Sequence, residues 1–126
     1  LSRGASFVTF VDKGKNQIRL IEKNCKKLKV DFEKIQIVQQ DSLQWIKKNE
    51  TSLENGVWIY FDPPYELESL YISFSKFVLS LNTEINVAIE SNNRLPFFSG
   101  IKDILSSGVS KIYSQGDKSI IKYKNY

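Results

Sequence analysis

One stretch, residues 57–65 (VWIYFDPPY), constrains the fold more than any other part of the chain. Its first five residues are apolar or aromatic without a break, which predicts a strand buried on both faces. Pro63 and Pro64 lack the amide hydrogen that a sheet ladder needs, so the strand ends before them. Asp62 and Tyr65 are therefore expected at the carboxyl end of a central strand, where ligands bind in open α/β sheets.

The turn Asp62-Pro63-Pro64-Tyr65 has the chemistry of a site for an amino group. The two prolines stiffen the backbone, so acceptors can be held in place before a substrate arrives. The Asp62 carboxylate and the Pro63 carbonyl can converge on one exocyclic base amine and free its lone pair for attack. The Tyr65 ring offers a flat face for base stacking, worth about 1–3 kcal/mol. The alternative is an ordinary strand end followed by a proline turn.

Two more acids follow predicted strands. Residues 7–11 form an apolar strand that ends at Asp12, where a Rossmann-like site hydrogen-bonds ribose hydroxyls. A plain acid in a strand-to-helix loop would give the same sequence. Residues 35–38 form a short strand, after which Asp41 or Ser42 caps a helix that runs through Asn49.

The remaining segments alternate between helices and strands, which indicates an α/β fold with a mostly parallel sheet. Residues 14–29 predict an amphipathic helix whose buried stripe includes Cys25, so this cysteine belongs to the core and is not a nucleophile. The stripe consists of Ile18, Ile21, Cys25 and Leu28. The other predicted elements are a helix tail over 1–5 stopped by Gly4, helices over 67–81 and 101–107, a strand over 85–89 followed by Glu90-Ser91-Asn92, and a terminal antiparallel hairpin over 109–113 and 120–123.

Composition narrows the class of protein. The 126 residues are 41% apolar and 13% aromatic, which suits one globular domain. A lone cysteine and no histidine argue against a disulfide or a zinc site and favour the reducing cytoplasm. No apolar run reaches membrane-spanning length. Residues 1–40 carry nine basic and four acidic side chains and residues 111–126 carry four and one, so both ends are basic, which fits a phosphate-bearing partner or simply a solvated lysine-rich surface.

At Asp62-Pro63-Pro64-Tyr65 the chain resembles the amino-methyltransferases that use S-adenosylmethionine, whose signature is Asp or Asn, Pro, Pro, then Tyr or Phe. Within that class it is most similar to the bacterial small-subunit ribosomal RNA guanine-N2 methyltransferases, the RsmD-like group. The matching segments span nearly the whole chain. They are Leu1-Ser2-Arg3-Gly4-Ala5, Val8-Thr9-Phe10-Val11-Asp12, Gln40-Asp41-Ser42, Phe61-Asp62-Pro63-Pro64-Tyr65 and Ile89-Glu90-Ser91.

The resemblance implies a Rossmann-like class I methyltransferase fold with S-adenosylmethionine as cofactor and no metal. It assigns catalysis to Asp62, Pro63, Pro64 and Tyr65. It assigns cofactor binding to Asp12, Lys13, Asp41, Ser42 and Asp62, with Asp12 on the ribose and Asp41 on the adenine amine.

One departure from the family stands out. Its fold has seven strands in one sheet, whereas this sequence predicts six and lacks the first strand and the Gly-rich loop. We therefore interpret residues 1–126 as a single methyltransferase domain without its N-terminal part, monomeric when full length, and we expect these residues alone to bind cofactor weakly. Asp12, Asp41 and Asp62 are expected at the same edge of one sheet. The missing strand would lie between the strands that end at Asp12 and Asp62, so these strands should flank an open slot, which we favour, or pair directly.

The leading functional hypothesis is methyl transfer to the exocyclic amine of a guanine in ribosomal RNA or a small-subunit assembly particle. A first alternative is a DNA adenine-N6 methyltransferase, because the same four-residue motif is common there. A second alternative is a non-catalytic remnant that binds RNA or a partner.

Overall fold

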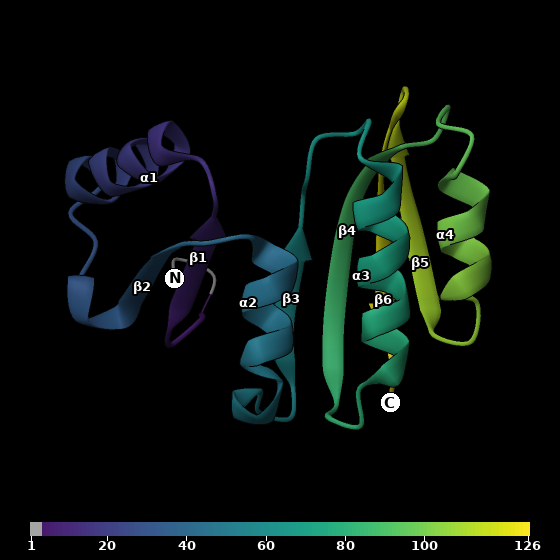
Figure 1. The fold of residues 1–126 in the computed structure, drawn as a ribbon, viewed down its shortest axis with the longest axis horizontal. Helices are drawn as coiled ribbons and strands as arrows, with labels where there is room; N and C mark the ends of the chain where they lie inside the picture. The colour runs from purple at the N-terminus through teal and green to yellow at the C-terminus, as the bar shows by residue number, and fades with distance from the viewer. Residues whose placement is uncertain (1–3) are drawn as a thin grey trace. The chain divides into compact units, whose positions relative to one another are not determined.

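A computed structural model describes residues 4–126 (Figure 1). Six strands and four α-helices follow one another in the predicted order, so the α/β class is confirmed. The helix tail predicted over residues 1–5 falls mostly on residues 1–3, which lie outside the described residues. No helix within residues 4–126 has the length and apolar character needed to cross a membrane. The chain divides into two compact units, Leu1–Asn49 and Glu50–Tyr126.

The first unit is a two-stranded parallel sheet with its helices. It contains β1 (Val8–Asp12), α1 (Lys15–Lys27), the 3-10 turn η1 (Phe32–Lys34), β2 (Ile35–Gln39) and α2 (Ser42–Lys48). The two strands pair in register from Val8 opposite Ile35 to Asp12 opposite Gln39. Both carboxyl ends therefore lie at the same edge of this small sheet.

Helix α1 buries part of the stripe that the sequence predicts, while Ile21 is half-buried and Leu28 is exposed. Ile18 and Cys25 are buried, whereas Leu28 is 74% exposed. The helix stops at Lys27 because Lys29 takes the left-handed conformation, with φ of 55°. The Val30 amide then donates to the Cys25 carbonyl at 3.0 Å, a Schellman-type ending that turns the chain away before Leu28 can pack.

The second unit is a four-stranded sheet of order β3-β4-β6-β5. It contains η2 (Glu50–Ser52), β3 (Val57–Phe61), α3 (Glu68–Ser80), β4 (Ile85–Asn92), α4 (Phe98–Ile104), β5 (Val109–Gln115) and β6 (Lys118–Lys124). Strands β3 and β4 are parallel, whereas β6 pairs antiparallel with both β4 and β5. The predicted terminal hairpin is thus confirmed, and Gly116, with φ of 61°, makes its tight turn.

Helices α3 and α4 pack beside each other over one face of this sheet (Figure 1). The core lies between them and the inward-facing strand residues. The ring of Phe61, the last residue of β3, stacks on Phe74 of α3 with centroids 3.9 Å apart. Other buried members of the core are Tyr71, Phe77, Val78, Ile85, Val87, Ile89, Ile101, Leu105, Ile121 and Tyr123.

Strand β3 differs from the prediction in two respects. It was expected to be central and buried on both faces, but within the described residues it is an edge strand of its sheet. Its side chains alternate, so Trp58 and Tyr60 point away from the helices and are 59% and 62% exposed. The sequence predicted burial on both faces because Trp58 and Tyr60 are counted as apolar residues. An aromatic side chain on an exposed face gives the same apolar run.

The three acids were also expected at the edge of one sheet. Instead, β1 pairs with β2 in the first unit and β3 pairs with β4 in the second, so Asp12 and Asp62 follow strands of two different sheets in residues 4–126. A physical reason is that β1 pairs with the strand that follows it in sequence, with α1 as the crossover, which is the usual pairing of sequential strands.

Several element bounds also moved, including the inner ends of the hairpin strands β5 and β6 and the end of α4 at Ile104. Strand β4 runs through Asn92 rather than ending at Ile89, because β6 continues to pair with it past the end of β3. Helix α4 begins at Phe98, three residues earlier than predicted. The extension of β4 matters for function, since it places Glu90 inside the strand.

Candidate active site

In the first unit, Asp12 is the last residue of β1, and Asp41 lies just after its parallel neighbour β2. The Gln40 amide donates to the Asp12 carbonyl at 3.0 Å, so the two strand ends are directly linked. The Asp12 carboxylate accepts a hydrogen bond from the Gly14 amide at 2.7 Å through Oδ1. This bond shapes the turn into α1 and leaves Oδ2 of Asp12 for another partner.

Asp41, rather than Ser42, caps α2. Its Oδ1 accepts from the Gln44 amide at 2.9 Å, which satisfies one of the free N–H groups at the helix start. Ser42 is the first residue of α2, and Lys13 is exposed in the turn between β1 and α1. The cap and the cofactor role are compatible for Asp41, because only one carboxylate oxygen is used by the cap.

In the second unit, the loop Asp62–Tyr65 leaves β3 and is fastened from two sides. On the helix side, the Tyr71 hydroxyl lies 3.3 Å from the Pro63 carbonyl oxygen and 2.8 Å from the Glu90 carbonyl oxygen. The hydroxyl has one proton and Glu90 is nearer, so the Pro63 carbonyl keeps acceptor capacity for a substrate. On the strand side, the Tyr65 hydroxyl donates to Glu90 Oε1 at 3.2 Å.

Glu90 is the centre of this second group. Its side chain is only 8% exposed, and its two oxygens accept from three donors in different segments. Tyr60 of β3 donates to Oε2, while Oε1 accepts from Tyr65 and lies 2.6 Å from Nζ of Lys118 at the start of β6. These donors offset the cost of burying the carboxylate.

The cluster shifts the ionisation of its members in opposite directions. Hydrogen bonds from Lys118 and Tyr60 hold the pKa of Glu90 below its usual range. Burial, and then the negative charge of Glu90, raises the pKa of Asp62. Burial is likewise the main reason that the pKa of Tyr71 is raised, so its hydroxyl keeps its proton and stays a donor. A carboxylate with a raised pKa is a stronger hydrogen-bond acceptor, which suits Asp62 for holding an amine.

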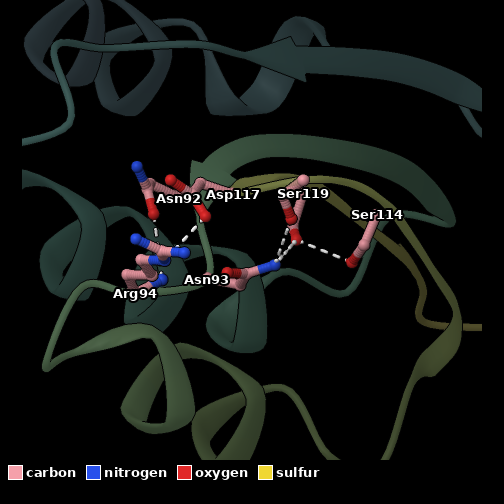
Figure 2. A network of polar contacts seen from close by, with 7 residues as sticks. Asn92, Asn93, Arg94, Ser114, Asp117 and Ser119 are labelled. Atoms are coloured by element: carbon pink, nitrogen blue, oxygen red, sulfur yellow. Dashed lines mark hydrogen bonds and ion pairs between the residues drawn. The ribbon is translucent and has the colours of Figure 1, made fainter.

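A polar network fixes the hairpin turn that lies just before Lys118 (Figure 2). Arg94 Nε lies 2.7 Å from Asp117 Oδ1, and the Asn93 amide donates to the Asp117 carbonyl at 2.8 Å. The Asn93 side-chain amide donates to the Gly116 carbonyl and to the Ser119 hydroxyl, each at 3.1 Å. The loop after β4 therefore holds the turn beside the end of β4, next to Glu90.

Sequence reasoning found the loop but not the residues that support it. Tyr60, Tyr71 and Lys118 were assigned no role, and Glu90 was recognised only as part of a matching segment. An acid directly after the apolar run 85–89 was the signal available for Glu90. Tyr71 is one residue of a broad apolar helix face, and no sequence signal distinguished its hydroxyl.

Comparison with known proteins places the chain in a family. The family model described as "Conserved hypothetical protein 95" matches residues 1–117. The chain belongs to this family. It is the family of the RsmD-like proteins, so the resemblance indicated by the motifs is confirmed. The match covers every predicted site residue of the chain and ends just before Lys118.

Solved structures share the fold of this chain at low sequence identity. A "conserved hypothetical protein" of Streptococcus pyogenes is 21% identical, with a TM-score of 0.69, and the match covers 99% of this chain and 75% of that one. A "putative methylase" of Haemophilus influenzae is also 21% identical, with a TM-score of 0.67, covering 98% and 75%. The protein SMU.776, a "putative methyltransferase complexed with SAH", is 15% identical with a TM-score of 0.76, covering 96% and 40%.

These likenesses confirm the Rossmann-like fold predicted from the sequence. A comparison with curated proteins gave no significant match.

Proposed function

We propose that this chain is the catalytic part of an S-adenosylmethionine-dependent methyltransferase that acts on the exocyclic amine of a guanine in small-subunit ribosomal RNA. The observation that carries the proposal is the loop Asp62–Tyr65, in which the Pro63 carbonyl lies beside the Tyr71 hydroxyl and the Tyr65 hydroxyl is bound by Glu90. Membership of the RsmD-like family and the SAH in the complex of SMU.776 support the same chemistry.

The residues of the first unit fit the adenosine part of the cofactor. Asp12 and Asp41 each use one oxygen for a local backbone bond and keep a second oxygen for a ribose hydroxyl or an adenine amine. Lys13 and Ser42 flank them and complete the proposed binding set. When bound, S-adenosylmethionine would supply the methyl group to the amine nitrogen, with its sulfur keeping the bonding electrons and water taking up the amine proton.

The residues of the second unit act on the target base. The Asp62 carboxylate and the Pro63 carbonyl accept hydrogen bonds from the amine and orient its lone pair, and Tyr65 stacks on the base. Pro64 stiffens the turn between them. The base has to leave its helical stack to reach such a site, so flexible or partly assembled RNA is the expected partner. We further propose that the full-length protein acts as a monomer in the cytoplasm.

The test is transfer of a labelled methyl group by the full-length protein to small-subunit assembly particles, with duplex DNA offered in parallel. Asp62→Ala should lower the rate at least about a hundredfold, the scale expected when a preorganised acceptor is removed. Asp62→Asn should retain part of the activity, since the family signature admits Asn. Asp103→Ala, which removes an exposed acid of α4, is the matched control.

The outcomes separate the candidate functions. Transfer to RNA that Asp62→Ala leaves undiminished removes the proposed role of Asp62. Transfer to DNA alone would favour the adenine-N6 alternative. Calorimetry that detects RNA binding but no cofactor binding by the full-length protein would favour the non-catalytic alternative.

A further inference from the structure

The Glu90 carboxylate joins three segments that are far apart in sequence. Its donors come from β3, from the loop after β3 and from the start of β6. An apolar residue would serve the sheet at this position without the cost of burying a charge. The carboxylate therefore needs an explanation other than sheet stability, and the loop that it contacts supplies one.

We propose that Glu90 is a positioning residue for the loop Asp62–Tyr65, with its carboxylate fixing the Tyr65 ring and its main-chain carbonyl holding the Tyr71 hydroxyl beside the Pro63 carbonyl. This inference rests on the proposed function, because it assigns Glu90 the task of holding the stacking ring and the amine acceptor of that site. It extends that function to residues outside the four-residue motif.

The geometry explains how the positioning works. The Tyr65 side chain can rotate about its two side-chain bonds, and a hydrogen bond at the far end of the ring restricts both rotations. The ring plane is then set before a base arrives, which lowers the entropy cost of stacking. Tyr60 binds the other oxygen of Glu90, so the carboxylate itself cannot turn freely.

Lys118 balances the negative charge of the Glu90 carboxylate. Without a nearby cation, the buried Glu90 carboxylate would repel Asp62. The Lys118 ammonium lies 2.6 Å from Glu90 Oε1, and Lys118 directly follows the hairpin turn that the Arg94–Asp117 pair anchors (Figure 2). The C-terminal hairpin thereby contributes to the loop that follows β3.

The test uses Glu90→Gln in the full-length protein, with Glu84→Gln as matched control. Glu84 is an exposed acid just before the same strand, and none of the three donors binds it. A 3-fluorotyrosine placed at position 65 reports on the ring by fluorine NMR, and hydrogen exchange reports on the Leu67 amide, which donates to the Pro64 carbonyl. In Glu90→Gln we expect the fluorine signal to move toward that of free fluorotyrosine and Leu67 to exchange faster, with neither change in the control.

Kinetics add a readout that a general loss of stability would not mimic. Glu90→Gln should lower kcat roughly tenfold, a loss of the scale caused by small misplacements, with little change in KM for the cofactor. Tyr65→Phe removes the same anchor from the other side, so the double variant should be no slower than the slower single variant. Fully additive losses would overturn the proposal.

The fluorine NMR and hydrogen-exchange measurements are decisive by themselves. An unchanged Tyr65 signal together with unchanged Leu67 exchange in Glu90→Gln overturns the positioning role, whatever the activity. If Glu90→Gln does not fold, Tyr65→Phe still tests the anchor, because faster Leu67 exchange in that variant supports the proposal and unchanged exchange overturns it. If the wild type transfers no methyl group to any nucleic acid, the proposed function fails, while these two measurements still decide the role of Glu90.

Discussion

The hydroxyl of Tyr71 lies 2.8 Å from the main-chain oxygen of Glu90, and it joins α3 to β4 beside the loop after β3. Tyr71 is fully buried, and its ring meets Phe61 edge to face at 5.7 Å between centroids. One side chain thus contacts the end of β3, the Pro63 carbonyl and the functional end of β4. The core of the second unit and its candidate site are therefore built from the same residue.

Tyr71→Phe should keep the packing and remove the hydrogen bond. We expect the free energy of unfolding to fall by about 1 kcal/mol, the usual net worth of such a bond. We also expect methyl transfer to slow, because the hydroxyl lies beside the Pro63 carbonyl. Urea denaturation measures the first effect and methyl transfer the second. Tyr113→Phe, at a 46% exposed position of β5, should leave stability within about 0.5 kcal/mol of the wild type. Equal losses in the two variants would contradict the structural role of the Tyr71 hydroxyl.

Gly108 and Gly100 make a second matched pair. A Cβ added to Gly108 would lie 2.4 Å from Cε2 of Tyr123 and 2.5 Å from the Lys124 carbonyl oxygen, neither of which can move without disturbing β6. We expect Gly108→Ala to destabilise the protein by about 1–3 kcal/mol through overpacking. Gly100 lies inside α4 with open space around it, so Gly100→Ala should be neutral or stabilise by up to about 1 kcal/mol. Thermal unfolding that ranks the two variants in the opposite order would refute this packing.

Local signals in the sequence predicted the elements and most of their ends. Pro63 and Pro64 end β3 because proline cannot continue the ladder, and Asp41 begins α2 because its side chain caps the helix. The end of α1 was missed by two residues. A lysine rather than a glycine takes the left-handed conformation there, and the sequence carries no mark of that choice.

Contacts between distant segments could not be predicted in the same way. Glu90 meets Lys118 because β4 and β6 pair with Glu90 opposite Ile120 and Asn92 opposite Lys118. That register depends on how the whole sheet assembles, and periodicity within one strand does not contain it. The edge position of β3 is likewise a property of strand order. The sequence therefore located the loop Asp62–Tyr65 but not the residues that hold it.

Asp41 offers a way to separate a structural role from a binding role. Asparagine caps helices as well as aspartate, so Asp41→Asn should keep the stability of the wild type, whereas Asp41→Ala should lose about 1 kcal/mol. In the proposed site, Oδ2 accepts from an adenine amine, and Asp41→Asn would place an NH₂ donor there. Both variants should therefore raise KM for the cofactor. A stable Asp41→Asn protein with unchanged KM would leave Asp41 as a helix cap and nothing more.

The carboxyl groups of the second unit predict how stability depends on pH. The pKa of Glu90 is lowered from its ordinary value of 4.5, so below that value the unfolded chain binds protons more readily than the folded one. Stability therefore falls as the pH drops through this window, and Glu90→Gln should remove that part of the loss. The pKa of Asp62 is raised from 3.8, so above that value the folded chain binds protons more readily, and Asp62 makes the opposite contribution. Asp62→Asn should accordingly steepen the loss of stability at low pH that Glu90→Gln flattens.

Urea unfolding at a series of values from about pH 3 to 7 measures both slopes, with Glu84→Gln as the control for removal of one exposed acid. Slopes that change in the same direction in the two variants would show that Glu90 and Asp62 do not ionise as this cluster requires.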